Sequence, residues 1–160
     1  MPSYMRAASG FGATIFDEDM VVETQYKWSR MMFDWYRELY NSASSKPGDC
    51  QFPVVIDGDK LIHDTESQMH KLCDILGIDP TGIQYSWDPV NTFESEMMEK
   101  FLGKIGRSTG VLRQEDYRIP LLKEEAEKWA EEWDEETAEK MKIFAEMAME
   151  DYRYLLERSI

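Results

Sequence analysis

The fold is decided by residues 52–87, which read FPVVIDGDKLIHDTESQMHKLCDILGIDPTGIQYSW. This stretch opens with a short apolar, β-branched run, and the turn residues Asp57, Gly58 and Asp59 close it. A short apolar run bounded by Gly and Asp is typical of a buried strand in a parallel sheet. We therefore predict one short buried strand at residues 53–57.

A capped amphipathic helix follows the predicted strand. Thr65 is a favourable N-cap residue, and Gln68 completes a capping box. Gly77 can take the left-handed conformation that ends a helix, and Pro80 prevents continuation. We expect a helix over residues 65–76. Its apolar residues recur at helical spacing and predict one buried face: Met69, Leu72, Cys73 and Leu76.

Helical periodicity dominates the remainder, and no second segment reads as a convincing strand. Residues 1–19 are expected to be irregular, because Gly10 and Gly12 interrupt any helix. The chain should therefore be predominantly helical. Besides 65–76, helices are expected near residues 22–40, 91–105 and 121–158, the second of these capped by Asn91.

Apolar stripes indicate which faces of these helices are buried. The helix at 22–40 carries Trp28, Met31, Met32, Trp35 and Leu39. The helix at 91–105 carries Met97, Met98, Phe101, Leu102 and Ile105. The closing stretch carries Ala126, Trp129, Ala130 and Trp133, then Met141, Phe144, Ala145, Ala148, Tyr152 and Leu155. Asp134 starts a new helix between these two stripes, or the two segments fuse; the sequence leaves both open.

The composition is acidic, with 18 Lys and Arg against 32 Asp and Glu, a formal charge of −14 over 160 residues. Such a field repels nucleic acid and anionic membranes, so neither is expected as a partner. No apolar stretch approaches the ~20 residues that span a bilayer, and no signal peptide is recognisable. Cys50 and Cys73 fit no metal-binding spacing, and a cytoplasmic location is expected.

The candidate chemical groups are few. His63 and His70 have no partner at ligand spacing, which argues against a metal site. Asp57 and Asp59 follow the predicted strand at the end where α/β sheets bind ligands, although turn formation also explains them. The loop at 106–110, GRSTG, offers backbone N–H groups and an arginine to an anion, but the end of a helix accounts for it equally well.

Several segments resemble the sulfotransferase-like P-loop family, in particular its bacterial and fungal small-molecule branch. The matching residues are Pro53-Val54-Val55-Ile56-Asp57, Leu72-Cys73-Asp74-Ile75-Leu76-Gly77-Ile78 and Ser86-Trp87, with Ser108-Thr109-Gly110 and the closing helix through Tyr152 and Leu155. The resemblance implies the α/β fold of P-loop nucleoside triphosphate hydrolases. It also implies that residues 1–160 are a single partial domain, the carboxyl-terminal half of a sulfotransferase-like domain.

The opening residues Pro2-Ser3-Tyr4-Met5-Arg6 look like the end of the family's second nucleotide motif. Ser3 matches the serine that reaches the 3′-phosphate of the donor, 3′-phosphoadenosine 5′-phosphosulfate. The arginine of that motif would stand before Met1. The resemblance thus implies a set of donor contacts: Ser3, Arg6, Arg107, Ser108, Thr109 and Gly110.

One departure from the family decides the functional prediction. The family's phosphate-binding loop and catalytic base lie in the amino-terminal half, and this sequence contains neither, so no catalytic residue is assigned. We expect a truncated sulfotransferase-like protein of secondary metabolism that binds no donor and is inactive alone. Its partner would be an amino-terminal half or a second copy. The alternative is a non-enzymatic, acidic helical interaction module.

Overall fold

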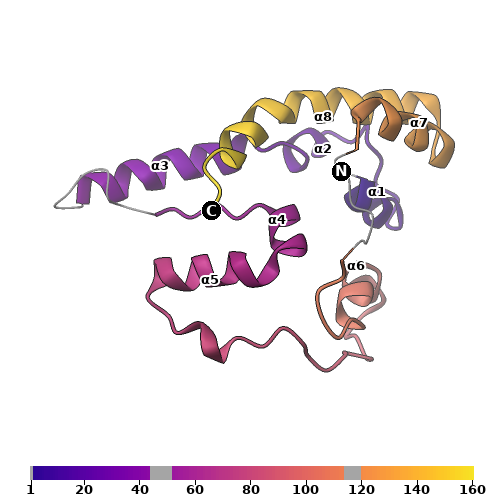
Figure 1. Cartoon of the computed structure of the whole chain (residues 1–160). Coiled ribbons are helices and arrows are strands. Elements are labelled where there is room, and N and C mark those ends of the chain that lie inside the picture. The colour runs from indigo at the N-terminus through magenta and orange to yellow at the C-terminus, as the bar shows by residue number, and fades with distance from the viewer. Residues whose placement is uncertain (1, 44–51, 114–119) are drawn as a thin grey trace. The chain divides into compact units, whose positions relative to one another are not determined.

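The computed structural model describes residues 2–43, 52–113 and 120–160, which form two compact units (Figure 1). Unit 1 consists of the described residues within Met1–Gln25, Pro89–Ser108 and Gln114–Glu150. Unit 2 consists of those within Tyr26–Asp88, Thr109–Arg113 and Asp151–Ile160. Each unit therefore combines segments that are far apart in the sequence. Whether both belong to one partial domain, as expected for residues 1–160, stays a prediction.

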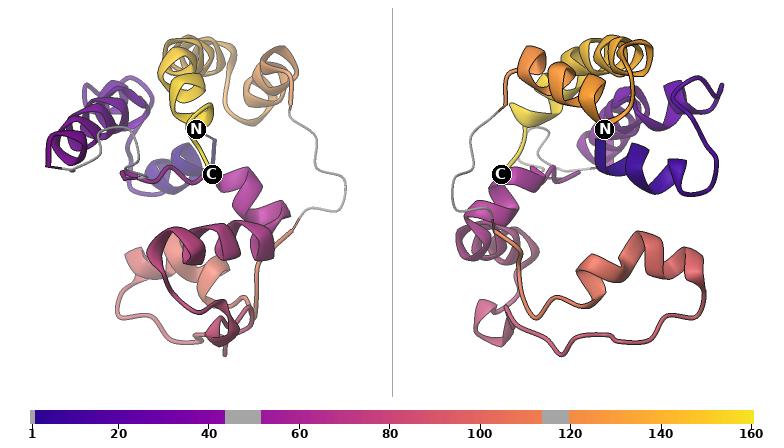
Figure 2. Two further views of the ribbon diagram at one scale, coloured as in Figure 1. Left: turned by 60° about the vertical axis from the view of Figure 1, so that its left-hand side comes forward. Right: turned by 90° about the vertical axis from the view of Figure 1, so that its right-hand side faces the viewer.

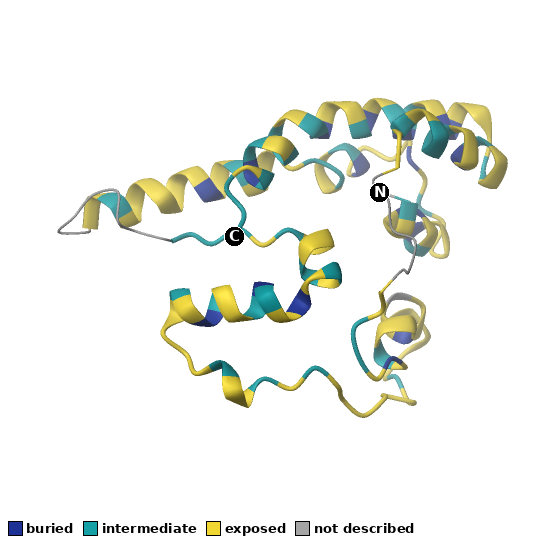
Figure 3. Ribbon diagram, viewed as in Figure 1, coloured by how far each residue is buried: buried dark blue, intermediate teal, exposed yellow. Residues whose placement is uncertain are grey.

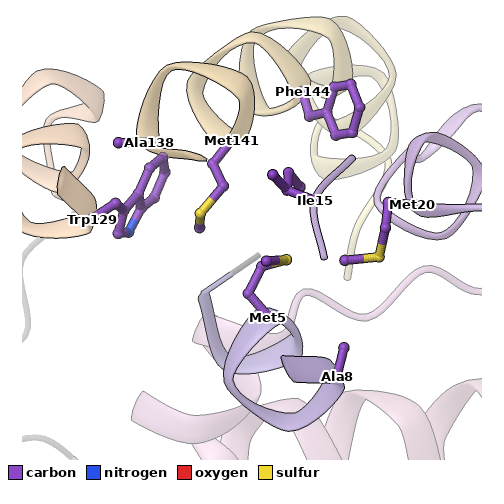
Figure 4. Packing of buried hydrophobic residues seen from close by; sticks show 8 residues of the cluster. All are labelled: Met5, Ala8, Ile15, Met20, Trp129, Ala138, Met141 and Phe144. Carbon is purple, nitrogen blue, oxygen red and sulfur yellow. The ribbon is translucent and has the colours of Figure 1, made fainter. Parts of the chain in front are cut away.

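Unit 1 is built from helices around a methionine-rich core. Its elements are α1 (Pro2–Ser9), α2 (Met20–Glu23), α6 (Glu96–Gly106), α7 (Leu122–Glu132) and the first part of α8 (Glu135–Leu156). Met5, Met20 and Met141 converge on Ile15 in the centre of this core (Figure 4). Trp129 and Phe144 complete it, so the buried stripes predicted for the closing stretch are confirmed.

The closing stretch is two helices rather than one. The side chain of Asp134 accepts hydrogen bonds from the backbone N–H of Thr137 at 2.8 Å and from its hydroxyl at 2.9 Å. These bonds lower the pKa of Asp134 and give α8 a separate, capped start. α7 ends before that cap and turns back beside the first part of α8, where Trp129 packs with Ala138 and Met141 (Figure 2).

Unit 2 contains α3 (Lys27–Ala43), α4 (Gly58–His63), α5 (Thr65–Leu76), the short 3-10 helix η1 (Pro80–Gly82) and the end of α8. The bounds of α5 confirm the predicted helix, but the predicted capping box is wrong. Thr65 is the first helical residue and its hydroxyl donates to the carbonyl of Ile62 at 3.3 Å, while Asp64 holds the N-cap position without a side-chain capping bond. Gly77 has φ +66°, and the N–H of Ile78 donates to the carbonyl of Cys73 at 2.9 Å. This is the left-handed helix end that the sequence indicated.

The α/β architecture implied by the family resemblance is wrong for the described chain, which contains no strand or sheet among residues 2–43, 52–113 and 120–160. The segment at 53–57 is extended, but it makes a single parallel bridge between Val55 and Ser159, and the N–H of Ile160 donates to Val55 at 3.1 Å. The other bridge is antiparallel, between Ser86 and Gly110. A strand requires a neighbouring strand, and the described chain supplies none. The prediction of a predominantly helical chain is confirmed.

The apolar stripe of α3 is exposed, contrary to the prediction (Figure 3). Trp28 is 52% exposed and Trp35 58% exposed, and Met31, Met32 and Leu39 are similar. The buried residue of α3 is Phe33, whose ring meets that of Tyr154 edge-on at 6.3 Å. Periodicity identified the apolar face correctly, but the described part of unit 2 does not cover it.

Other faces of the predicted core are also more open than expected. On α5, Cys73 is buried as predicted, whereas Leu76 is 45% exposed. On α6, Met97, Met98, Leu102 and Ile105 are exposed; the side chain of Phe101 lies outside the described residues. For α5 and α6, the position of the helix is therefore predicted better than the burial of its side chains.

Three boundaries differ from those predicted. α1 forms within the stretch expected to be irregular, because Gly10 and Gly12 follow its last turn rather than interrupt it. α6 begins after Ser95, whose hydroxyl accepts the N–H of Met98 at 3.2 Å, rather than after Asn91. The helix expected at 22–40 is divided into α2 and α3. Cys50 lies outside the described residues, and no described helix is long and apolar enough to cross a membrane.

Substitution of Met141 by alanine should destabilise the chain by about 2–5 kcal/mol, because its side chain is 0% exposed and its removal leaves a cavity in the unit 1 core. The free energy of unfolding from denaturant titration measures this. Met147→Ala is the matched control, since Met147 lies on the same helix and is 54% exposed. Equal losses for the two variants would show that the core is wrongly placed.

Candidate functional site

A pocket of about 420 Å³ lies within unit 2. Its lining residues come from α3, from the extended segment with the start of α4, and from the last turns of α8. Figure 1 shows where these elements lie. Aromatic and apolar side chains dominate these walls: Tyr26, Phe33, Tyr36, Val55, Tyr152 and Leu155. This combination of size and lining is typical of a site for a small molecule.

Asp57 stands where the extended segment meets α4 and lines the pocket. It is the N-cap of α4, and its Oδ1 accepts the backbone N–H of Lys60 at 3.0 Å. Its Oδ2 accepts the hydroxyl of Tyr152 at 3.2 Å. The turn-forming role that the sequence indicated is therefore present, together with a contact to the pocket wall.

The pKa of the Tyr152 hydroxyl is raised. Burial of the ring, followed by the nearby negative charge of Asp57, raises the pKa of Tyr152 to about 12. Asp59 contributes in the same direction. The ring of Tyr26 lies 5.4 Å from that of Tyr152 at an interplanar angle of 47°. The Asp57 side of the pocket is thus an electronegative corner flanked by two aromatic rings.

Unit 2 also holds a cation-rich cluster around Tyr154. Arg30 and Arg158 lie over its ring at 4.2 Å and 3.6 Å, and its hydroxyl donates to Asp34 at 2.5 Å. Arg30 also pairs with Asp151 at 2.8 Å. The hydrogen bond to Asp34 raises the pKa of Tyr154. These contacts join α3 to the end of α8 and thereby fix one wall of the pocket.

Two of the predicted donor contacts, Ser3 and Arg6, lie on α1 in unit 1. Ser3 is exposed. Arg6 makes a bidentate ion pair with Glu132, Nε to Oε1 at 2.6 Å and Nη2 to Oε2 at 2.7 Å. This hydrogen-bonded pair raises the pKa of Arg6 and lowers that of Glu132. The positive charge of Arg6 is therefore already matched by a carboxylate.

The other predicted contacts follow α6. Arg107 pairs with Glu99, and its guanidinium lies 5.6 Å from the centre of the Phe93 ring. The hydroxyl of Ser108 donates to the carbonyl of Ile105 at 2.5 Å, just after the end of α6. Arg107 and Ser108 belong to unit 1, whereas the next two residues belong to unit 2.

Thr109 and Gly110 are held by backbone contacts within unit 2. The carbonyl of Thr109 accepts the N–H of Trp87 at 3.1 Å, and Gly110 bridges to Ser86. A Cβ at Gly110 would lie 3.2 Å from the carbonyl oxygen of Tyr85, which explains the glycine. Among the described residues, the predicted donor contacts thus form two groups that are already close in the sequence: Ser3 with Arg6 on α1, and residues 107–110 after α6. Their contact with a nucleotide stays a prediction.

The pairing of Asp57 with Tyr152 was missed by sequence reasoning. Asp57 was assigned to a turn and Tyr152 to a buried stripe, and they lie 95 residues apart. Spacing carries no signal for such a pair. The one available indication was the position of Asp57 after an apolar run, where ligands bind in many α/β proteins.

Comparison with known proteins supports the family resemblance. The chain is 28% identical to the sulfotransferase ppzF of Metarhizium majus over an alignment of 143 residues, and this alignment covers 86% of the chain. It is 26% identical over the same length to sulfotransferase ppzF of Metarhizium rileyi. The chain spans 42% of the length of these relatives. No family model and no solved structure matches. The sequence is therefore similar to these two sulfotransferases over most of its own length.

Asp57→Asn should lower the pKa of Tyr152, because a neutral amide no longer opposes the phenolate, while burial keeps the pKa above the ordinary 10.0. Since the folded pKa is raised, the stability contributed by the neutral phenol is complete below pH 10 and is lost as the pH rises toward 12. NMR titration of ring-labelled tyrosines measures this, with Tyr152→Phe to assign the signal. An unchanged pKa in Asp57→Asn would contradict the contact.

Proposed function

We propose that this chain is part of a sulfotransferase-like protein that transfers a sulfuryl group from 3′-phosphoadenosine 5′-phosphosulfate to a small-molecule acceptor of secondary metabolism. One observation carries the proposal: 86% of the chain aligns with two fungal proteins named sulfotransferase. The cytoplasmic setting expected from the sequence fits the buried free thiol of Cys73.

Sulfuryl transfer depends on cations and oriented N–H groups that stabilise the charge on the moving group. In this chain, Arg6 and Arg107 already face Glu132 and Glu99, and the formal charge of −14 disfavours a polyanion. We therefore assign the phosphate-binding loop and the catalytic base to sequence beyond these 160 residues. The relatives have the length to hold them, because the chain spans 42% of theirs.

The isolated chain should show no measurable binding of 3′-phosphoadenosine 5′-phosphate by calorimetry. Fusion to the amino-terminal portion of the Metarhizium majus relative should restore binding, because that portion would supply the phosphate-binding loop. Micromolar binding by the 160 residues alone would contradict the proposal. If no amino-terminal portion restores binding, the non-enzymatic alternative is favoured instead.

In the fusion that binds, Ser3→Ala should weaken binding by about 10–100-fold, because a charge-assisted hydrogen bond is worth ~1.5–3 kcal/mol. Ser9→Ala is the matched control: it removes a hydroxyl from the same helix, and that hydroxyl bonds to the carbonyl of Arg6. Equal effects of the two variants would remove Ser3 from the donor site.

A second candidate function is the acidic helical interaction module. The exposed stripe of α3 favours it, since two tryptophans, two methionines and a leucine occupy one helix face. Soluble monomers rarely expose a contiguous apolar patch of this kind, and Trp and Met are enriched at protein interfaces. The stripe is suited to contact a second copy or an amino-terminal half.

The chain should self-associate in sedimentation velocity experiments at tens of micromolar, a concentration typical for association through exposed apolar surface. Met31→Glu on the α3 stripe should shift the population to monomer, because it places a charge in that surface. Met147→Glu on α8 is the control, as Met147 has a similar exposure and lies in unit 1. A clean monomer of the unmodified chain would argue against this function.

A further inference from the structure

The unit 2 pocket combines an apolar body with one charged corner. Phe33, Val55 and Leu155 form the body, whereas Tyr26 and Met32 at the mouth are largely exposed. A volume of about 420 Å³ accommodates a small organic molecule. Because Tyr26 and Met32 are exposed, the pocket is open to solvent on their side.

Asp57 is the charged side chain among the described residues that line this pocket. Its two hydrogen bonds come from neutral donors, the backbone N–H of Lys60 and the phenol of Tyr152. Neither donor cancels the charge of the carboxylate. Each carboxylate oxygen can accept a further hydrogen bond, so the corner has capacity for a charged donor.

The aromatic rings beside Asp57 add to this preference. The rings of Tyr26 and Tyr152 are inclined to each other at 47°, with centroids 5.4 Å apart. Because the rings are not stacked in parallel, they do not cover each other's faces completely. The face of an aromatic ring attracts a cation through its quadrupole. Burial is the main cause of the raised pKa of Tyr152, and the nearby negative charges of Asp57 and Asp59 add to it.

We propose that this pocket binds a small organic monocation, with its ammonium group against Asp57, Tyr26 and Tyr152 and its apolar body against Phe33, Val55 and Leu155. This inference goes beyond sulfuryl transfer and does not depend on it. Every residue involved lies in unit 2, and none belongs to the predicted donor contacts.

Three probes with one carbon skeleton separate charge from shape: phenethylamine as the cation, 2-phenylethanol as the neutral form and phenylacetate as the anion. The full 160-residue chain is titrated with each probe while ring-labelled tyrosine signals are recorded by NMR. Phenethylamine should shift the signals of Tyr26 and Tyr152 and should bind about ten-fold more tightly than 2-phenylethanol. Phenylacetate should not bind. Equal affinities, or shifts confined to other tyrosines, would overturn the proposal.

Asp57→Asn is the decisive variant. Asparagine caps a helix as well as aspartate and can still accept the N–H of Lys60, so the fold is retained while the charge is removed. The preference for phenethylamine over 2-phenylethanol should disappear. Asp79→Asn is the matched control: Asp79 is an N-cap in the same unit, accepts the N–H of Thr81 at 2.9 Å and does not line the pocket.

The control also tests the general attraction of an acidic chain for cations. If Asp79→Asn weakens binding as much as Asp57→Asn, the effect comes from net charge and the site is refuted. Tyr26→Leu keeps an apolar wall but removes the aromatic face. It should lower the affinity for phenethylamine by about three-fold, with little effect on the affinity for 2-phenylethanol. Loss of both ligands in equal measure would show that Tyr26 acts only through packing. Nucleotide binding is not a readout here, so failure of this proposal leaves the sulfotransferase proposal untouched.

Discussion

The single backbone bridge of the segment at 53–57 is the constraint on which unit 2 depends. Backbone N–H and C=O groups that leave water need partners, and within the described part of the chain the backbone of Val55 pairs with Ser159 and Ile160. The segment is therefore held mainly at its end, where Asp57 caps α4 and accepts the hydroxyl of Tyr152. The pocket follows from this arrangement, because side chains of α3 and α8, rather than neighbouring strands, line the extended segment.

Several positive charges of this chain lie against carboxylates. Arg6, Arg30 and Arg107 each pair with a carboxylate of this chain, so their charges are matched locally, and the net charge of −14 already includes them. The pair between Arg6 and Glu132 is exposed, and solvent screens exposed ion pairs so that they contribute little to stability. Displacing Glu132 from Arg6 would therefore cost little. The greater obstacle to a polyanionic donor is repulsion by the surrounding carboxylates, which only additional cations can offset.

Local signals in the sequence predicted local structure well. Gly77 ends α5 as expected, because a left-handed glycine depends on hydrogen bonds within a few residues, whereas the capping box predicted at Thr65 does not form. Non-local features were predicted poorly. The period of the α3 stripe identified an apolar face but not what covers it, and Trp28 and Trp35 are exposed. The contact between Asp57 and Tyr152 likewise depends on how α8 ends, which no spacing reveals.

Met32 connects the two candidate binding surfaces of unit 2. It belongs to the exposed stripe of α3 and also lines the pocket beside Asp57. A partner that covers the stripe would therefore also contact the mouth of the pocket, and the two binding events cannot be independent. Linkage requires this effect to be reciprocal. If a pocket ligand lowers the affinity of association by some factor, association lowers the affinity of the ligand by the same factor. Self-association measured with and without a bound cation would report this coupling directly, and Asp57→Asn should remove it without altering the stripe.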